Sequence, residues 1–63
     1  MNIDINELKE EDKNRLVVYK NYRLERTEEG VITSWNDTYI FVRYGGDNHS
    51  KATSPRDLDW SIK

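Results

Sequence analysis

The chain contains no cysteine and only one histidine, His49, among its 63 residues. Disulfide bonds and thiolate metal sites are therefore excluded, and a single histidine cannot hold a zinc ion alone. No apolar run approaches the roughly 20 residues of a membrane-spanning helix, and the first residues lack the basic and apolar regions of a signal peptide. These absences predict a soluble, cytoplasmic protein without a metal ion or other cofactor.

A strong basic excess is absent as well, because the formal net charge is −2. The charge is uneven along the chain: residues 1–14 are acidic, and residues 15–26 carry four bases against one acid. Non-specific binding to nucleic acid depends on phosphate neutralisation by clustered lysine and arginine. The overall balance therefore makes nucleic acid a weaker default partner than protein.

Charged and hydrophobic residues each make up 35% of the chain, which predicts a thin core beneath a heavily charged surface. A chain of 63 residues is close to the lower size limit for one hydrophobic core without a covalent or metal staple. The aromatic residues supply large buried area per side chain, and we expect Trp35 and Trp60 to lie in the core. The length leaves room for one domain, residues 1–63.

Residues 30–46 have the pattern of one β-hairpin bounded by glycines. Two runs rich in β-branched and aromatic residues flank Asn36 and Asp37, and both of these residues tolerate the left-handed backbone of a tight hairpin turn. A two-stranded hairpin alone is marginally stable in water, so the remaining segments have to complete a small sheet or barrel.

Short elements are expected on both sides of this hairpin. Asn14 is expected in the left-handed region just before the first strand. The remaining expected elements are a short helical turn over 6–12, strands over 15–19 and 49–53, the second with Ala52 inward, a long loop over 20–29, a one-turn 3-10 helix over 54–57 and a last strand through Leu58 and Trp60. Together they predict a mainly all-β fold: a five-stranded SH3-like barrel over 15–60, after an acidic N-terminal segment over 1–14.

This layout resembles the Tudor and KOW group of SH3-like barrels, in which a Gly-x-Val strand meets a Val-x-Val strand and a Pro-x-x-Leu turn leads to the end. More closely, residues 28–37, 39–44 and 50–58 resemble a group of small, largely uncharacterised phage and prophage proteins, and the likeness extends over residues 8 to 60. Asn14 stands where glycine is expected in such proteins. The resemblance implies a fold, a phage-related origin and a location in the host cytoplasm, and it implies no particular chemistry.

The third strand has apolar residues on both faces, since side chains alternate along a strand. Ile40 and Val42 are assigned to the core, which leaves Tyr39, Phe41 and Arg43 on the outer face. Three interpretations stay open: this outer stripe binds a partner, the N-terminal residues Ile3, Ile5 and Leu8 cover Phe41, or the strand register is different.

Aromatic residues and arginine are enriched at protein interfaces, so the first hypothesis is a non-enzymatic protein-interaction module. It uses Tyr39, Phe41 and Arg43, with Tyr22 and His49, to bind a host protein or a second copy of the chain. The alternative is a KOW-like nucleic-acid-binding barrel. The basic residues assigned to that alternative are Lys20, Arg23, Arg26, Arg43 and Lys51, and a solvated charged loop is the simpler interpretation of the first three.

Two further chemical readings of the sequence are weaker. Four tyrosines (Tyr19, Tyr22, Tyr39 and Tyr44) are candidates for a half-exposed aromatic groove, which in Tudor-type barrels can hold a methylated cation. His49 lies beside Asp47 and Ser50, but neighbouring residues in a glycine-rich turn do not make a catalytic triad without fixed geometry. We therefore predict that the protein is not an enzyme.

Overall fold

The computed structural model describes residues 3–21 and 26–61. These residues form five β-strands and three single turns of 3-10 helix, and they contain no α-helix. The strands are β1 (Leu16–Asn21), β2 (Arg26–Trp35), β3 (Ile40–Tyr44), β4 (Lys51–Thr53) and β5 (Leu58–Trp60). The 3-10 turns are η1 (Ile5–Glu7), η2 (Glu10–Asp12) and η3 (Pro55–Asp57).

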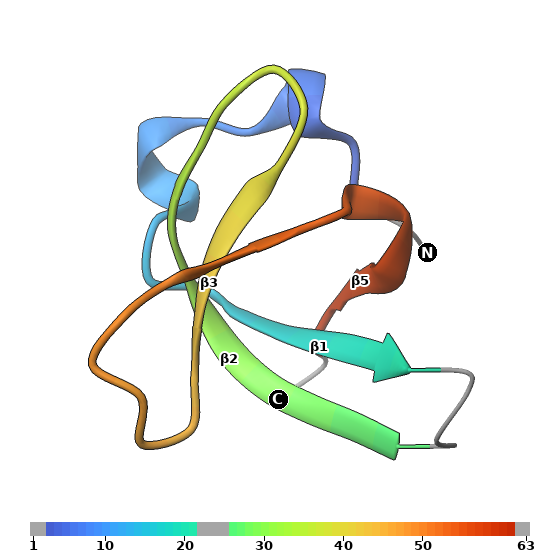
Figure 1. Cartoon of the computed structure of the whole chain (residues 1–63). Coiled ribbons are helices and arrows are strands. Elements are labelled where there is room, and N and C mark those ends of the chain that lie inside the picture. The colour runs from blue at the N-terminus through green and yellow to red at the C-terminus, as the bar shows by residue number, and fades with distance from the viewer. Residues whose placement is uncertain (1–2, 22–25, 62–63) are drawn as a thin grey trace.

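All five strands belong to one antiparallel sheet in the order β4-β3-β2-β1-β5 (Figure 1). The prediction of a mainly β protein with five strands and a 3-10 turn before the last strand is confirmed. Within residues 3–21 and 26–61, β4 and β5 form the two edges and no backbone ladder joins them. The sheet is therefore open and strongly curved rather than closed by hydrogen bonds (Figure 1).

The first two strands are longer than predicted. The predicted loop over 20–29 is wrong at both ends, because residues 20–21 belong to β1 and residues 26–29 belong to β2. The ladder between β1 and β2 continues through the pairs Tyr19 with Glu28 and Lys20 with Thr27. Residues 26–29 of β2 are all exposed. Because none of residues 26–29 is buried, this part of β2 lacks the apolar alternation by which strands are recognised.

The β2–β3 connection also differs from the prediction. Asn36 and Asp37 are not left-handed; among the described non-glycine residues only Asn14 has a positive φ, 71°, as predicted for that position. Instead, the Asn36 side-chain oxygen accepts hydrogen bonds from the backbone N–H groups of Thr38 at 2.8 Å and Tyr39 at 2.7 Å. The asparagine therefore makes the turn with its side chain rather than with an unusual backbone conformation.

The inner face of the sheet holds one cluster of buried hydrophobic residues. Ile40 and Val42 belong to it, as predicted, and Trp35 and Trp60 are partly buried against it. The cluster consists of Ile3, Val17, Ile32, Ile40, Val42, Tyr44 and Leu58. Apolar burial on this face supplies the main stabilisation of the sheet.

The inward placement of Ala52 was wrong. Ala52 is exposed, and the next residue, Thr53, is buried with 7% of its surface accessible. The register explains the difference, since Thr53 pairs with the inward Ile40 and Ala52 pairs with the outward Phe41. Paired residues on neighbouring strands point to the same side of a sheet.

The N-terminal segment is docked on the sheet at the end that carries the β2–β3 turn (Figure 1). Its helical part, predicted as one short helix over 6–12, is two 3-10 turns separated by the extended Leu8. Ile5 and Leu8 pack against the inner cluster. The Asp12 carboxylate accepts hydrogen bonds from the Lys9 backbone N–H and from the Arg15 guanidinium, both at 2.9 Å.

We expect Gly30→Ala to destabilise the fold, because a methyl group at this position has no space. A Cβ atom there would lie 2.6 Å from Val42 Cγ1 and 2.9 Å from the Arg43 backbone oxygen. Overpacking of this kind lowers the free energy of unfolding by about 1–3 kcal/mol, measured by urea denaturation. Gly46→Ala is the matched control, since a Cβ atom at Gly46 meets nothing within 4 Å. Equal stability of the two variants would contradict the close approach of β2 and β3.

Asp12 makes the stability of the fold depend on pH. Its hydrogen bond from Arg15, followed by that from the Lys9 backbone, lowers the pKa of the Asp12 carboxyl below its ordinary value of 3.8. The contribution of this carboxylate is therefore present above the unfolded-state pKa and is lost as the pH falls through the lower folded-state pKa. We expect Asp12→Asn to be less stable than the wild type at neutral pH.

The difference should shrink as the pH of the thermal denaturation series falls from about 5 to about 2, because the wild type then loses the same charge. Glu11→Gln controls for the change in net charge, since Glu11 is exposed and forms no hydrogen bond within the described part of the chain. A constant difference between wild type and Asp12→Asn across this range would contradict the assignment.

Candidate functional site

The outer face of the sheet carries hydrophobic side chains that no second layer of described residues covers. Leu16, Val31 and Arg43 form one cross-strand row over β1, β2 and β3. Phe41 lies two residues from Arg43 on the same face and pairs with Ala52 of β4. We call these five residues, Leu16, Val31, Phe41, Arg43 and Ala52, the outer patch.

The members of the outer patch differ in exposure. Leu16 is 41% exposed, Arg43 and Ala52 are exposed, and Val31 and Phe41 are partly buried. A side chain as large as leucine in so exposed a position contributes little to the core of its own chain. The patch therefore combines apolar side chains from β1, β2, β3 and β4 with the cationic side chain of Arg43.

The N-terminal hydrophobic residues pack on the other side of the sheet. Ile3 is buried in the inner cluster, and Ile5 and Leu8 pack against that cluster. Phe41 belongs neither to the cluster nor to the residues packed against it. The inner cluster therefore explains the burial of Ile3, Ile5 and Leu8 without a contact with Phe41.

Sequence reasoning found two members of the outer patch, Phe41 and Arg43, and missed the other three. Alternation puts Leu16 and Val17 on opposite faces, but the run is apolar throughout and does not show which of the two enters the core. Val31 and Ala52 could be placed only with the strand register. The β-bulge between Ile32 and Ser34 shifts that register within β2.

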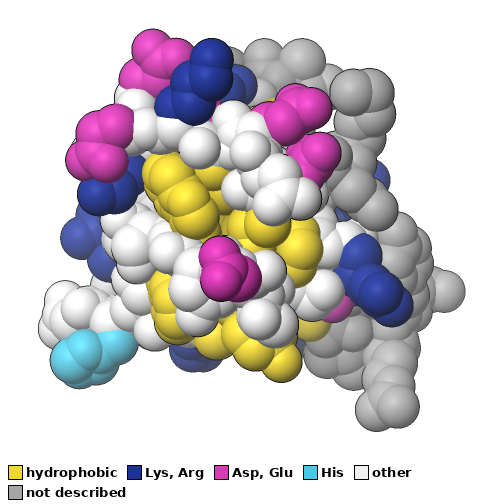
Figure 2. All heavy atoms as spheres, turned by 90° about the horizontal axis from the view of Figure 1, so that it is seen from above, with side chains coloured by type: hydrophobic (Ala, Val, Ile, Leu, Met, Phe, Trp, Pro, Cys, Tyr) yellow, Lys and Arg dark blue, Asp and Glu magenta, His cyan; other side chains and the backbone are white. Residues whose placement is uncertain are grey.

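Tyr39 lies apart from the outer patch. It precedes β3 and is 44% exposed, at the rim of an open groove of about 720 Å³ between the N-terminal segment, the β2–β3 turn and η3. Ile5, Pro55 and Arg56 also line this groove. Figure 2, which views this end of the molecule, shows hydrophobic side chains gathered near its centre with charged side chains around them.

The basic residues assigned to nucleic acid are partly neutralised by acidic partners. Lys20 forms an ion pair with Asp59 across β1 and β5, and this lysine lowers the pKa of the Asp59 carboxyl. The Lys51 ammonium lies 3.6 Å from the Asp47 carboxylate. Arg26 and Arg43 are exposed. Tyr22 and Arg23 lie outside the residues that the structure describes.

His49 and its neighbours do not form a catalytic arrangement. His49 is exposed in the β3–β4 connection and forms no hydrogen bond within residues 3–21 and 26–61. The Ser50 hydroxyl lies 2.6 Å from the Thr33 hydroxyl, and Asp47 is paired with Lys51.

In the described part of the chain no three His, Cys, Asp or Glu side chains are grouped so as to hold a metal ion. No helix among these residues has the length and apolar character to cross a membrane.

A second hollow of about 320 Å³ lies on the inner face, at the end of the sheet away from Ile3. Tyr19 and Tyr44 form an edge-to-face pair in its wall, with ring centroids 5.9 Å apart and an interplanar angle of 67°. The hydroxyl oxygens of Tyr44 and Thr53 are 2.8 Å apart. Burial raises the pKa of the Tyr44 hydroxyl above its ordinary value. Tyr44, predicted as part of a half-exposed groove, is thus a buried wall residue.

Comparison with family models, with curated proteins and with solved structures gives no match to this chain. The class that the fold and surface define is a small antiparallel β protein with one uncovered apolar face. Any function has to be inferred from the outer patch, the groove at Tyr39 and the hollow at Tyr44.

The Tyr44 hydroxyl makes a measurable contribution to stability. Tyr44→Phe removes its hydrogen bond with the buried Thr53 and leaves that hydroxyl with only a 3.3 Å bond to the Lys51 backbone oxygen. We expect the free energy of unfolding in urea to fall by about 1 kcal/mol. Tyr39→Phe is the control, because Tyr39 is 44% exposed, and it should change stability by less than about 0.5 kcal/mol. A Tyr44→Phe variant as stable as the wild type would show that water replaces this hydrogen bond.

Proposed function

We propose that the protein is a small, non-enzymatic protein-interaction module that binds its partner through the outer patch. The observation that carries this proposal is the combination of Leu16, Val31 and Phe41 with Arg43 on an uncovered sheet face. The buried centres of protein interfaces are depleted of lysine and acidic residues and enriched in aromatic residues and arginine. Such a patch gives apolar area for affinity and a guanidinium for orientation.

The fold proposed for this module is an SH3-like barrel. The five antiparallel strands and the 3-10 turn between β4 and β5 support it, because both match the layout expected from the sequence. The resemblance to small phage and prophage proteins supports a phage-related origin. Under that origin the partner is a host protein in the cytoplasm, or a second copy of the chain.

The charge distribution favours a protein partner over a nucleic acid. Lys20 and Lys51 already lie beside carboxylates. A phosphate backbone would have to displace Asp59 and Asp47 to use them, which reduces the gain from each contact. Arg43 has no ion-pair partner among the described residues, and it lies beside apolar side chains rather than among other cations. The KOW-like alternative is therefore the second hypothesis.

We expect Phe41→Ala and Arg43→Ala to weaken partner binding or self-association by about tenfold or more each, since a side chain central to an interface is worth over 1 kcal/mol. Self-association is measured by sedimentation at several concentrations, and partner capture is compared between wild type and variants. Arg56→Ala is the control for Arg43→Ala, because both arginines are exposed. Association unaffected by either patch variant would refute the proposal.

Stability distinguishes a surface role of Phe41 from a core role. Ile40→Ala, which empties a fully buried site, should cost about 2–5 kcal/mol of unfolding free energy. Phe41→Ala should cost clearly less, because Phe41 lies outside the inner cluster. Equal losses in the two variants would place Phe41 in the core and remove it from the interface.

A salt series separates the two hypotheses. The wild type should give no electrophoretic shift with random DNA or RNA at low salt. Binding that appears at low salt and weakens steeply as salt rises would support the nucleic-acid alternative, since counterion release sets that slope. An interface anchored by apolar side chains responds weakly to salt.

A further inference from the structure

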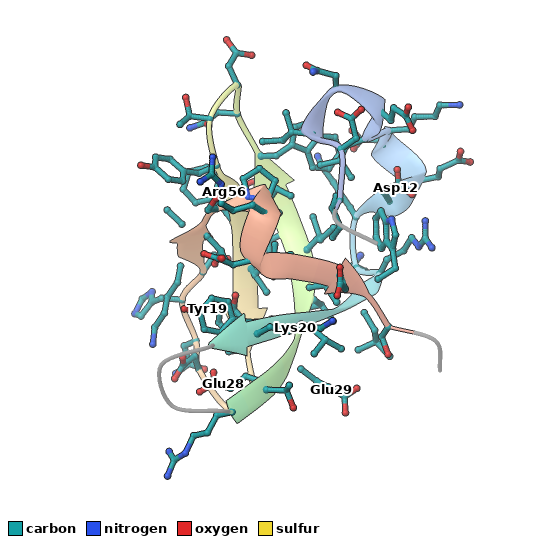
Figure 3. All side chains as sticks on the ribbon, turned by 90° about the vertical axis from the view of Figure 1, so that its right-hand side faces the viewer. Asp12, Tyr19, Lys20, Glu28, Glu29 and Arg56 are labelled. Atoms are coloured by element: carbon teal, nitrogen blue, oxygen red, sulfur yellow. The ribbon has the colours of Figure 1, made fainter. Side chains whose placement is uncertain are left out.

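The hollow beside Tyr44 lies on the opposite face of the sheet from the outer patch. It is lined by Tyr19 of β1, Glu28 of β2, Tyr44 of β3 and Asp57 of η3, with residues 51–54 along one side. Tyr19 and Glu28 are cross-strand partners, so their side chains lie on the same face. Figure 3 shows these two side chains beside each other at one end of the sheet. We call Tyr19, Glu28, Tyr44 and Asp57 the tyrosine–carboxylate pocket.

The two carboxylates of the pocket have no cationic partner within the part of the chain that the structure describes. Neither Glu28 nor Asp57 forms an ion pair or a side-chain hydrogen bond with any residue in the described ranges 3–21 and 26–61. Lys51 lines the same hollow, but its ammonium lies 3.6 Å from the Asp47 carboxylate. The charges of Glu28 and Asp57 also act on the buried Tyr44 and add to the increase in the pKa of its hydroxyl. Both carboxylates therefore line the same hollow.

The tyrosine pair gives this space an aromatic wall of fixed orientation. The edge-to-face geometry of Tyr19 and Tyr44 is a favourable arrangement of two ring quadrupoles. The Tyr44 ring is further held by its hydroxyl contact with Thr53. Aromatic faces attract cations, and the attraction increases when the cation is partly removed from water.

From this geometry we propose that the tyrosine–carboxylate pocket binds a primary ammonium group, namely a lysine side chain presented by a partner protein. Three donors on one nitrogen can be shared between Glu28 and Asp57, which come from different elements of the fold. A guanidinium is matched instead to one carboxylate that accepts two parallel hydrogen bonds. The volume, about 320 Å³, accommodates one long side chain, whose apolar stem would pack along the tyrosine rings.

The test is an NMR titration of the whole chain with Nα-acetyl-lysine N-methylamide, whose side-chain ammonium group is free. We expect saturable chemical-shift changes at Tyr19, Glu28 and Tyr44 with a millimolar dissociation constant. The norleucine derivative, which has a four-carbon apolar side chain and no ammonium group, should cause none. The arginine and trimethyllysine derivatives should bind several-fold more weakly, because the first has the wrong donor geometry and the second has no donors. The absence of saturable shifts, or equal binding of norleucine or arginine, would overturn the proposal.

Variants locate the site. Glu28→Gln should weaken lysine binding about fivefold, the effect of losing one charge-assisted hydrogen bond. Glu11→Gln makes the same change in net charge away from the pocket and should leave binding unchanged. Glu28 is exposed, so both variants are expected to fold, and thermal denaturation checks this. Equal affinity of Glu28→Gln and wild type would exclude this carboxylate.

Of the outer patch only Ala52 also lines this hollow, and Leu16, Val31, Phe41 and Arg43 do not, so the pocket can be tested separately from the proposed function. Phe41→Ala should therefore bind the lysine derivative as the wild type does. A loss of lysine binding in Phe41→Ala with unchanged thermal stability would show that the ligand occupies the outer patch, and would overturn the assignment to the pocket.

Discussion

The alternation of side chains along β3 is the constraint on which the rest of the structure depends. Ile40, Val42 and Tyr44 are fully or almost fully buried on one face, while Phe41 and Arg43 lie on the other. β2 can approach this face because Gly30, opposite Tyr44, has no side chain to separate the strands. β1 and β5 continue the same sheet, and the N-terminal segment packs on the same side. A few residues at the centre thus decide which face is closed and which stays uncovered.

The parts of the fold that could be predicted are those with a local signal. Asn14 has the left-handed backbone that asparagine tolerates, and Pro55 begins a 3-10 turn as its fixed φ favours. The pairing of residues 20–21 with 26–27 could not be predicted, because residues 26–29 are exposed and carry no apolar pattern. The inward position was predicted for Ala52 instead of Thr53 for a related reason. The faces of a short strand follow from its register with β3, and a three-residue segment does not encode that register.

The candidate site shows the same division. Phe41 and Arg43 were predicted from a single strand, since alternation inside one strand is visible in the sequence. Leu16 and Val31 join them only because three strands are placed side by side in one register. Tyr39 was assigned to the same stripe by counting backwards from Phe41, yet the strand begins at Ile40 and the turn places Tyr39 in the groove beside the N-terminal segment. Side chains alternate between the two faces only within a strand, so the rule does not apply to Tyr39.

The two ends of the inner face are lined by different kinds of side chain. Ile3, Ile5 and Leu8 cover the end near the β2–β3 turn with apolar side chains. At the other end the lining is made of Tyr19, Tyr44 and carboxylates. Leu16, Val31 and Phe41 lie on the outer face and cannot close this second end, which is lined by groups that tolerate water. Glu28 and Asp57 lie at this open end together with Lys51, while Arg43 lies beside apolar side chains on the outer face. The two faces do not differ in the sign of their charge, because Glu29 and Asp59 share the outer face with Lys20 and Arg43.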